Sequence, residues 1–148
     1  MNPAPPACGI EFDHIGILVA DLDAACRDWG RLLSPLAWTA RFDDPLLGVS
    51  VRFARDAAGI IYELIAPLND ASPVLRTLKS GKNLLHQLAY RTASLEHSMQ
   101  RLRAEHAVPV GSPAPALAFR GARVQFLMTP LGFLIELIET DRVLHEFR

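Results

Sequence analysis

The feature that most constrains the fold of this 148-residue chain is an internal repeat with an offset of 73 residues. Residues 12–19 read FDHIGILV, and residues 85–92 read LHQLAYRT in the same register, so that His14 corresponds to Gln87. The same offset relates the tripeptide ELI near the end of each half without a gap. Such a repeat predicts two copies of one unit that pair with each other, because a half of about 60 residues does not readily bury its own sheet face.

Composition and charge narrow the function classes. Half of the residues are apolar, and 15 basic side chains balance 16 acidic ones. This near-neutral balance gives no electrostatic reason to expect nucleic acid or an anionic membrane surface as a partner. Two cysteines do not make a disulfide framework, and no apolar run approaches the ~20 residues that a membrane span needs. The N-terminus lacks the basic and apolar regions of a secretory signal, so we expect a cytoplasmic protein.

The hydrophobic pattern predicts an α+β fold in which each half has the order strand, helix and then three strands. The first strand is apolar on both faces, which indicates a sheet with helices behind it. In the first half we expect strands near 12–19, 37–42, 48–54 and 60–66, with a helix after Asp21. In the second half we expect strands near 84–92, 108–111, 120–128 and 132–139, with a helix from Ser94 to about Glu105.

These elements predict one domain flanked by two tails. Ser72 and Pro73 resemble the start of a short helix in the segment that joins the halves. The expected parts are a flexible tail (1–11), a single domain (12–139) made of module one (12–66), a linker (67–82) and module two (83–139), and a C-terminal tail (140–148) with a turn of helix.

Two glutamates interrupt apolar runs at equivalent repeat positions. Glu63 lies within IIYELI and Glu136 within FLIELI. Burying an unpaired carboxylate costs several kcal/mol, so such a residue is paired, protonated, bound to a metal or not buried. A solvent-facing strand residue is the simpler interpretation for one glutamate alone. Two at matching positions, each 49 residues after His14 or Gln87, favour a shared site.

His14 and Gln87 are the other candidate ligands, since an imidazole nitrogen and an amide oxygen can both bind metal. Strand alternation predicts that His86 points to the opposite face from Gln87. A bulge that exchanges these two residues is the alternative.

The four predicted site residues His14, Glu63, Gln87 and Glu136 would leave a divalent ion formally neutral. This oxygen-rich set suits cobalt, nickel, manganese or magnesium at least as well as zinc, with one or two coordination positions open. Open positions beside a carboxylate suit the polarisation of a substrate carbonyl while the carboxylate moves a proton. Glu63 and Glu136 are the two carboxylates that could move this proton.

The doubled βαβββ unit, which opens with DHIG at Asp13 and closes with IEL at Glu136, resembles the vicinal oxygen chelate superfamily. That group includes glyoxalase I, extradiol dioxygenases, bleomycin-resistance proteins and methylmalonyl-CoA epimerase. The closest likeness is to the epimerase, through His14, the linker sequence ELIAPLNDAS and the sequence LHQLAY. The resemblance implies two tandem modules that form a curved, half-barrel mixed sheet around a central cavity. It also implies that the four predicted site residues stand at the metal positions, and that Glu136, with Glu63 as the second candidate, is the proton carrier.

The chain departs from the family at two positions. The family usually has a second histidine where Gln87 stands, and the resemblance places the second proton-transfer glutamate of the epimerase at Val51. Epimerisation needs acid–base groups on both faces of the α-carbon, and a valine cannot serve.

From the resemblance we expect a metal-dependent isomerase or lyase that acts on a small acyl or 2-oxo compound. The alternatives are a non-catalytic binding protein of the bleomycin-resistance kind and an iron-dependent extradiol-type dioxygenase, which would need His86 in place of Gln87. The expected partner is a small-molecule substrate, with an acyl-CoA as one option. A homodimer is one option for the assembly.

Overall fold

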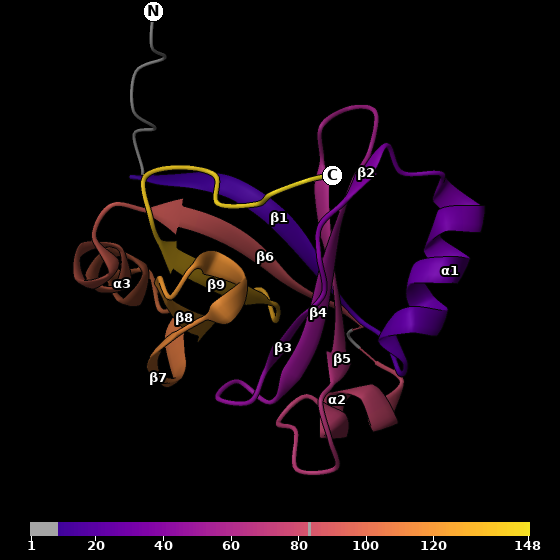
Figure 1. Cartoon of the computed structure of the whole chain (residues 1–148). Helices are drawn as coiled ribbons and strands as arrows, with labels where there is room; N and C mark the ends of the chain where they lie inside the picture. The colour runs from indigo at the N-terminus through magenta and orange to yellow at the C-terminus, as the bar shows by residue number, and fades with distance from the viewer. Residues whose placement is uncertain (1–8, 83) are drawn as a thin grey trace, which may run out of the picture.

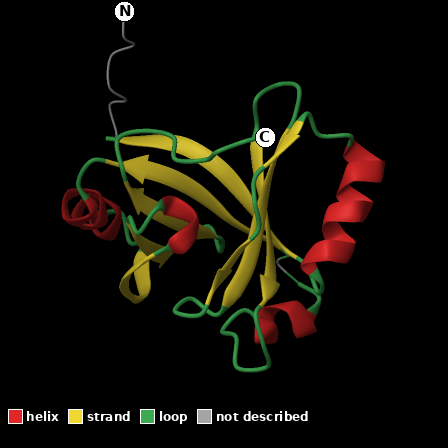
Figure 2. Ribbon diagram, in the orientation of Figure 1, coloured by secondary structure: helices red, strands yellow, loops and turns green. Residues whose placement is uncertain are grey.

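Each half of the chain contributes a run of strands and one long helix to a shared mixed sheet (Figures 1 and 2). The computed structural model describes residues 9–82 and 84–148, and within them there are nine strands, three α-helices and one 3-10 helix. The strands are β1 (Ile10–Leu18), β2 (Ala37–Trp38), β3 (Phe42–Asp44), β4 (Val49–Arg55), β5 (Ile61–Pro67), β6 (Leu85–Thr92), β7 (Val108–Pro115), β8 (Arg123–Met128) and β9 (Leu134–Glu139). The helices are α1 (Leu22–Leu33), α2 (Leu75–Ser80), α3 (Leu95–Ala104) and the 3-10 helix η1 (Leu117–Phe119). The predicted α+β class is confirmed.

The sheet joins the two modules through their first strands. Its order is β2-β4-β5-β1-β6-β9-β8-β7, with β3 paired to β4, and it is curved and unclosed (Figure 1). β1 and β6 are antiparallel neighbours at the centre, and each has the last strand of its own module as a parallel neighbour. Gly16 pairs with Glu63, and Ala89 pairs with Glu136. The two ladders therefore share one register under the 73-residue offset.

Helices α1 and α3 pack on the outer faces of the two halves of the sheet (Figure 2). Each begins at a polar cap: Asp21 accepts a hydrogen bond from the Ala24 N–H at 2.8 Å, and Ser94 accepts one from the His97 N–H at 3.2 Å. In the described part of the chain, none of the helices is long and apolar enough to cross a membrane. The core behind α1 contains Leu22, Cys26, Leu64 and Ala66, and the core behind α3 contains Leu95, Leu102, Leu127 and Leu137.

The concave inner face carries the largest core cluster, and both modules contribute to it. The 3-10 helix and the C-terminal segment also pack into this cluster, so the inner face is largely filled with apolar side chains. The buried members are Leu18, Val51, Phe53, Ile61, Ile65, Ala89, Ala116, Ala118, Phe119, Val124 and Ile138, with Leu144 and Phe147 among the partly buried ones.

The ends of the chain differ from the sequence prediction. Ile10 and Glu11 belong to β1 instead of to the predicted flexible tail, the first eight residues of which lie outside the described residues. Residues 140–148 contain no helical turn. An irregular chain reaches further per residue than a helix, and it brings Leu144 and Phe147 onto the inner core. The linker helix α2 starts at Leu75, three residues after the predicted cap.

The predicted strand 37–42 is divided into β2 and β3. The Thr39 hydroxyl accepts the Phe53 N–H at 3.1 Å, and the Thr39 carbonyl accepts instead from the Arg52 side chain at 2.9 Å. The Thr39 hydroxyl thus replaces the Thr39 carbonyl as the acceptor for Phe53, and the β2–β4 ladder ends there. η1, which was not predicted, follows β7, and the Leu117 N–H that begins it donates to Asp44 at 3.0 Å.

Candidate functional site

The four predicted site residues lie together at the centre of the concave face, and each comes from a different strand. His14 lies in β1, Glu63 in β5, Gln87 in β6 and Glu136 in β9. The His14 Nε2 is 3.2 Å from Glu63 Oε1 and 3.5 Å from Glu136 Oε1. The Gln87 Nε2 donates to Glu63 Oε1 at 3.1 Å. All four residues are at most 5% exposed, so this is a buried polar centre in an apolar wall.

Small residues make room for the two ligand-type side chains of β1 and β6. His14 pairs with Ala89, and Gln87 pairs with Gly16. A Cβ at Gly16 would lie 2.5 Å from Gln87 Nε2 and 2.8 Å from its Oε1. A side chain of any size at position 16 would therefore displace the Gln87 amide.

Two β-bulges interrupt the β1–β6 ladder at equivalent repeat positions. Asp13 is the extra residue between the pairs of Phe12 and His14, and His86 is the extra residue before the pair of Gln87 with Gly16. A bulge leaves one residue unpaired and redirects its side chain. Asp13 and His86 both bond to the side chain that follows them, Asp13 to His14 and His86 to Gln87.

The alternation prediction for His86 is therefore wrong. Its Nδ1 bonds to Gln87 Oε1, and its ring lies 6.5 Å from the ring of Phe126. Phe126 pairs directly with Glu136, so it faces the concave side. The bulge brings His86 to the same face as Gln87 without exchanging the two residues, because Gln87 keeps its contact with Glu63.

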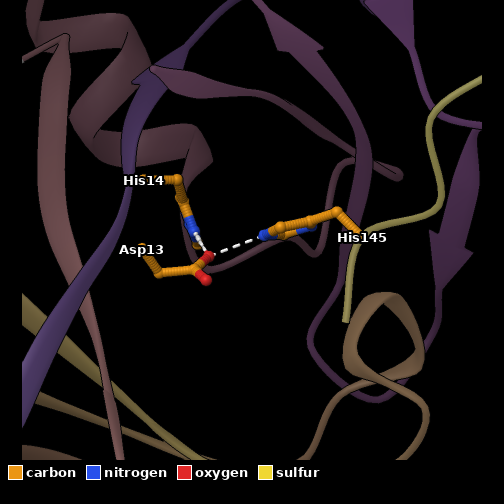
Figure 3. A group of neighbouring side chains, drawn as sticks. All are labelled: Asp13, His14 and His145. Carbon is orange, nitrogen blue, oxygen red and sulfur yellow. Dashed lines mark hydrogen bonds and ion pairs between the residues drawn. The ribbon is translucent and has the colours of Figure 1, made fainter. Parts of the chain in front are cut away.

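Asp13 lies between two histidines, His14 and His145 (Figure 3), and it also binds one arginine. Its Oδ2 accepts hydrogen bonds from His14 Nδ1 and His145 Nε2, both at 2.6 Å. Its Oδ1 accepts from Arg91 Nη1 at 3.3 Å. The Asp13 contact orients the ring of His14 so that its other nitrogen faces the two glutamates.

The sequence interpretation missed both Asp13 and His145 as site residues. Asp13 stands directly before His14, but strict alternation places it on the other face. The equivalence of Asp13 and His86 in the repeat was the available signal. His145 had none, because its contact with Asp13 joins residues 132 positions apart.

Burial and hydrogen bonds shift the pKa values of this cluster in a consistent way. Burial lowers the pKa of His14, but the hydrogen bond to Asp13 and the nearby carboxylates of Glu136 and Glu63 outweigh it and hold the pKa well above 6.5. Burial raises the pKa of Glu136 to about 7, against a smaller opposing effect of His14. Burial also raises the pKa of Asp13, yet the bonds from His14 and His145 hold it well below its usual range. Near neutral pH the centre thus contains an imidazolium and a carboxyl that titrates.

The donor atoms of this centre suit a divalent cation, which would replace the proton on the Nε2 of His14. One nitrogen of His14 and one oxygen each of Glu63 and Glu136 lie within 4.8 Å of one another, and Glu136 Oε1 is buried without a hydrogen-bond partner among the described residues. Gln87 presents its amide nitrogen to Glu63 and its oxygen to His86, so its oxygen would join the set after a rotation of the amide. Asp13, His14 and His145 form a second such group, but the guanidinium of Arg91 beside Asp13 disfavours a cation there.

The surroundings of the four predicted site residues are more enclosed than the central cavity that the resemblance implies. On the concave side a cavity of about 150 Å³ is lined by Thr39, Phe42, Leu117, Ala118, Arg120, Leu144, His145 and Glu146. Val51 is buried in the inner core on the same face as Phe53, so no carboxylate stands at the position where the resemblance placed a second base. A wider hollow of about 500 Å³ lies between α1 and the outer face, lined by Asp23, Cys26, Arg27, Trp38 and Arg52, and it includes none of the four predicted site residues.

Comparisons with known proteins identify the family and the fold. A sequence profile described as Glyoxalase/Bleomycin resistance protein/Dioxygenase superfamily matches residues 13–126. The structure of methylmalonyl-CoA epimerase from Mycobacterium tuberculosis is similar with 28% identity over 88% of each chain and a TM-score of 0.71. The hypothetical protein BH1468 from Bacillus halodurans C-125 is similar with 26% identity over 90% of this chain and 96% of that one, at a TM-score of 0.76.

A third structure supports the fold alone. It is a methylmalonyl-CoA epimerase in complex with methylmalonyl-CoA and NH4+, with 24% identity over 91% of this chain and 97% of that one, at a TM-score of 0.69. A comparison with curated protein sequences finds no match. The profile match spans most of the chain, and the curved, unclosed mixed sheet agrees with it. The chain therefore belongs to the glyoxalase/bleomycin resistance protein/dioxygenase superfamily.

Proposed function

We propose that this protein is a metal-dependent isomerase or lyase that moves a proton at the carbon next to the carbonyl of a small acyl or 2-oxo compound. The observation that carries the proposal is the buried cluster of His14 with Glu63 and Glu136, whose donor atoms lie within 4.8 Å of one another. In the metal-free chain burial raises the pKa of Glu136 to about 7, and a carboxyl that titrates near neutral pH can both accept and return a proton. The similarity to methylmalonyl-CoA epimerase makes an acyl-CoA the first substrate to test.

The residues of the centre would divide the work. His14 Nε2 and the oxygens of Glu63 and Glu136 would hold a divalent ion, with the Gln87 oxygen as a fourth ligand. When bound, such an ion supplies charge that polarises a carbonyl oxygen, and its identity among cobalt, nickel, manganese, zinc and magnesium is open. Asp13 fixes the ring of His14, and Glu136 carries the proton, with Glu63 as the second candidate. The apolar walls that Phe53 and Phe119 contribute keep water away from the carboxyls.

The absence of a carboxylate at Val51 limits the reaction to one face of the substrate. Glu136 would abstract and return a proton on its own side, and a buried valine offers no second base. We therefore expect slow or one-sided exchange at the α-carbon of methylmalonyl-CoA instead of rapid epimerisation. Val51→Glu is expected to raise epimerisation, since a positioned base contributes about 10²–10⁴-fold.

The test combines two measurements on protein purified without chelator. Metal content is determined by mass spectrometry, and exchange of the α-proton of methylmalonyl-CoA in deuterated water is followed by NMR. Glu136→Gln is the matched variant, because it keeps the size of the side chain and removes its proton chemistry. Stoichiometric metal with exchange that depends on Glu136 supports the proposal. Exchange that is unchanged in Glu136→Gln would contradict the assigned role.

The second candidate function is small-molecule binding without turnover, as in bleomycin-resistance proteins. Two residues favour this candidate. The neutral Gln87 stands where the family usually has a histidine ligand, and the apolar Val51 stands where the epimerase has a glutamate base. Ligand binding with neither bound metal nor exchange would support this candidate. For the dioxygenase alternative, His86 reaches the concave face, but the Gln87 amide separates it from Glu63. The cytoplasmic location and the homodimer remain predictions.

A further inference from the structure

The C-terminal segment, residues 140–148, crosses the concave face from module two to module one (Figure 1). It leaves β9 beside the centre of the sheet and ends at β2, where the Arg148 N–H donates to the Trp38 carbonyl at 3.0 Å. The ring of Phe147 lies under the guanidinium of Arg55, 4.6 Å away. Glu146 pairs with Arg120 of module two. The last two residues of the C-terminal segment thus contact strands β2 and β4 at the far edge of module one.

The middle of this segment lies directly on the candidate site. His145 reaches Asp13 at 2.6 Å, and its ring centre is 4.3 Å from that of Phe53 and 5.7 Å from that of His14. The His145 side chain is 1% exposed. Leu144 packs on the inner core and lines the 150 Å³ cavity.

The His14 side of the predicted site is therefore covered by the C-terminal segment, together with Phe119 of η1, whose ring stacks on that of His14 at 5.7 Å. The four predicted site residues are at most 5% exposed, and the cavity beside His145 is far smaller than an acyl-CoA. A ligand that reaches the four predicted site residues therefore has to displace a part of the chain that covers them. The sheet strands cannot move without the loss of their ladders, whereas residues 140–148 form no helix or strand.

We propose that residues 140–148 are an intramolecular strap that occupies the ligand side of the site, and that an acyl ligand must displace it to bind. This inference rests on the proposed function for the identity of the ligand, but closure by the strap is a property of the free chain. His145 is its latch, and Phe147 with Arg55 is its distal anchor. Removal of the anchor raises the fraction of open molecules without a change at the site itself.

The test measures how often His145 becomes accessible in the full chain. Diethyl pyrocarbonate modifies exposed histidines, and mass spectrometry reports the rate for each one. His97 lies on an exposed turn of α3 and serves as the internal reference. We expect His145 to react far more slowly than His97 in the native chain, because reaction requires local opening.

Two variants loosen the anchor from opposite sides. Phe147→Ala removes the ring from the strap, and Arg55→Ala removes its partner from the exposed end of β4. Each is expected to raise the rate at His145 by about 5- to 30-fold, the range that a loss of one or two anchor contacts produces. Val143→Ala is the control, since Val143 lies in the same segment and is 52% exposed. It should leave the rate unchanged.

Hydrogen exchange of β1 separates local from global opening. Its amides should stay protected in both anchor variants, and if Phe147→Ala unfolds the chain, the surface variant Arg55→Ala still decides the question. Equal rates at His145 and His97 in the native chain would overturn the proposal. So would unchanged rates at His145 in a folded Arg55→Ala variant.

A second arm adds methylmalonyl-CoA. Binding should speed modification of His145 and hydrogen exchange of residues 140–148, because the ligand takes their place. If the compound binds while His145 stays protected, the strap proposal is wrong and the proposed function stands. If the compound does not bind, but the anchor variants expose His145 as expected, the proposed substrate is wrong and the strap stands.

Discussion

Strands β1 and β6 share the same β-bulge, but the side chains that the two bulges position differ in charge. Each has a bulge one residue before its ligand-type side chain, at Asp13 in β1 and at His86 in β6. In β1 the bulged carboxylate holds a histidine that carries charge. In β6 the bulged histidine holds a neutral glutamine amide. The repeat has kept the geometry of the two halves while their charges differ.

This difference indicates that the two halves contribute unequally to the site. The His14 half contains the strongly bonded group, since Asp13 is itself supported by Arg91 and His145. The Gln87 half offers an adjustable amide whose oxygen is turned toward His86. A cation or substrate oxygen should therefore depend on β1 far more than on β6. The following experiments test that inequality.

The largest effect is expected when the two equivalent ligands are removed in turn. His14→Ala should abolish measurable Mn²⁺ or Co²⁺ binding, because it removes the one nitrogen donor in the cluster of His14, Glu63 and Glu136. Gln87→Ala should weaken binding by less than about tenfold, since carboxylates supply most of the charge. Equilibrium dialysis measures both. Equal losses in the two variants would mean that the halves contribute alike.

Glu136 should give the metal-free chain a characteristic pH dependence. Its folded pKa of about 7 lies above the ordinary 4.5, so the folded form keeps a proton that the unfolded chain releases. The stabilisation is complete below pH 4.5 and is lost as the pH rises toward 7, in total on the order of 3 kcal/mol. His14 adds its own loss only above pH 6.5, and Asp13 acts only below 3.8.

Urea unfolding of chelator-treated protein between pH 4.5 and 6.5 isolates the effect of Glu136. The native chain should lose stability across this window, and Glu136→Gln should remain level because it has no proton to release. A native chain as level as the variant would show that burial does not raise the pKa of this carboxyl.

The two bulged residues should differ in their effect on metal affinity. Asp13→Asn should weaken binding by about 10–100-fold, the usual result of removing a partner that orients a ligating histidine. His86→Ala should change affinity only a few-fold, since its partner Gln87 carries no charge. Isothermal titration measures both, with thermal unfolding to confirm that each variant folds. A larger loss of metal affinity in His86→Ala than in Asp13→Asn would favour the dioxygenase alternative.

The smallest effect concerns the small residues opposite the two ligands. Gly16→Ala should push the Gln87 amide away from Glu63 and cost about 1–3 kcal/mol through the lost hydrogen bond. Ala89→Gly, the matched change opposite His14, should cost only about 0.5–1 kcal/mol through added backbone freedom. Urea unfolding compares them. A Gly16→Ala variant as stable as the native chain would show that the Gln87 side chain can adopt another conformation at no cost in stability.

The architecture was accessible from the sequence because its signals are local and repeated. The offset that relates His14 to Gln87 and Glu63 to Glu136 predicted two equivalent modules, and in the structure Gly16 pairs with Glu63 as Ala89 pairs with Glu136. Two copies of one hydrophobic pattern specify the same unit twice. Carboxylates at matching positions within apolar runs predicted a buried centre, and the structure brings these four residues together. Their roles as metal ligands and proton carriers remain predictions.

Only the tertiary structure decided how this centre is supported and covered. A bulge shifts one residue out of the period of two, and the sequence around Asp13 and His86 does not show where that shift occurs. The contact between His145 and Asp13 depends on the path of an irregular segment across the finished sheet. Such a contact forms because burial of Leu144 and Phe147 stabilises that path. Strand periodicity carries no information on this contact, since the partners are 132 residues apart and one of them lies outside any strand.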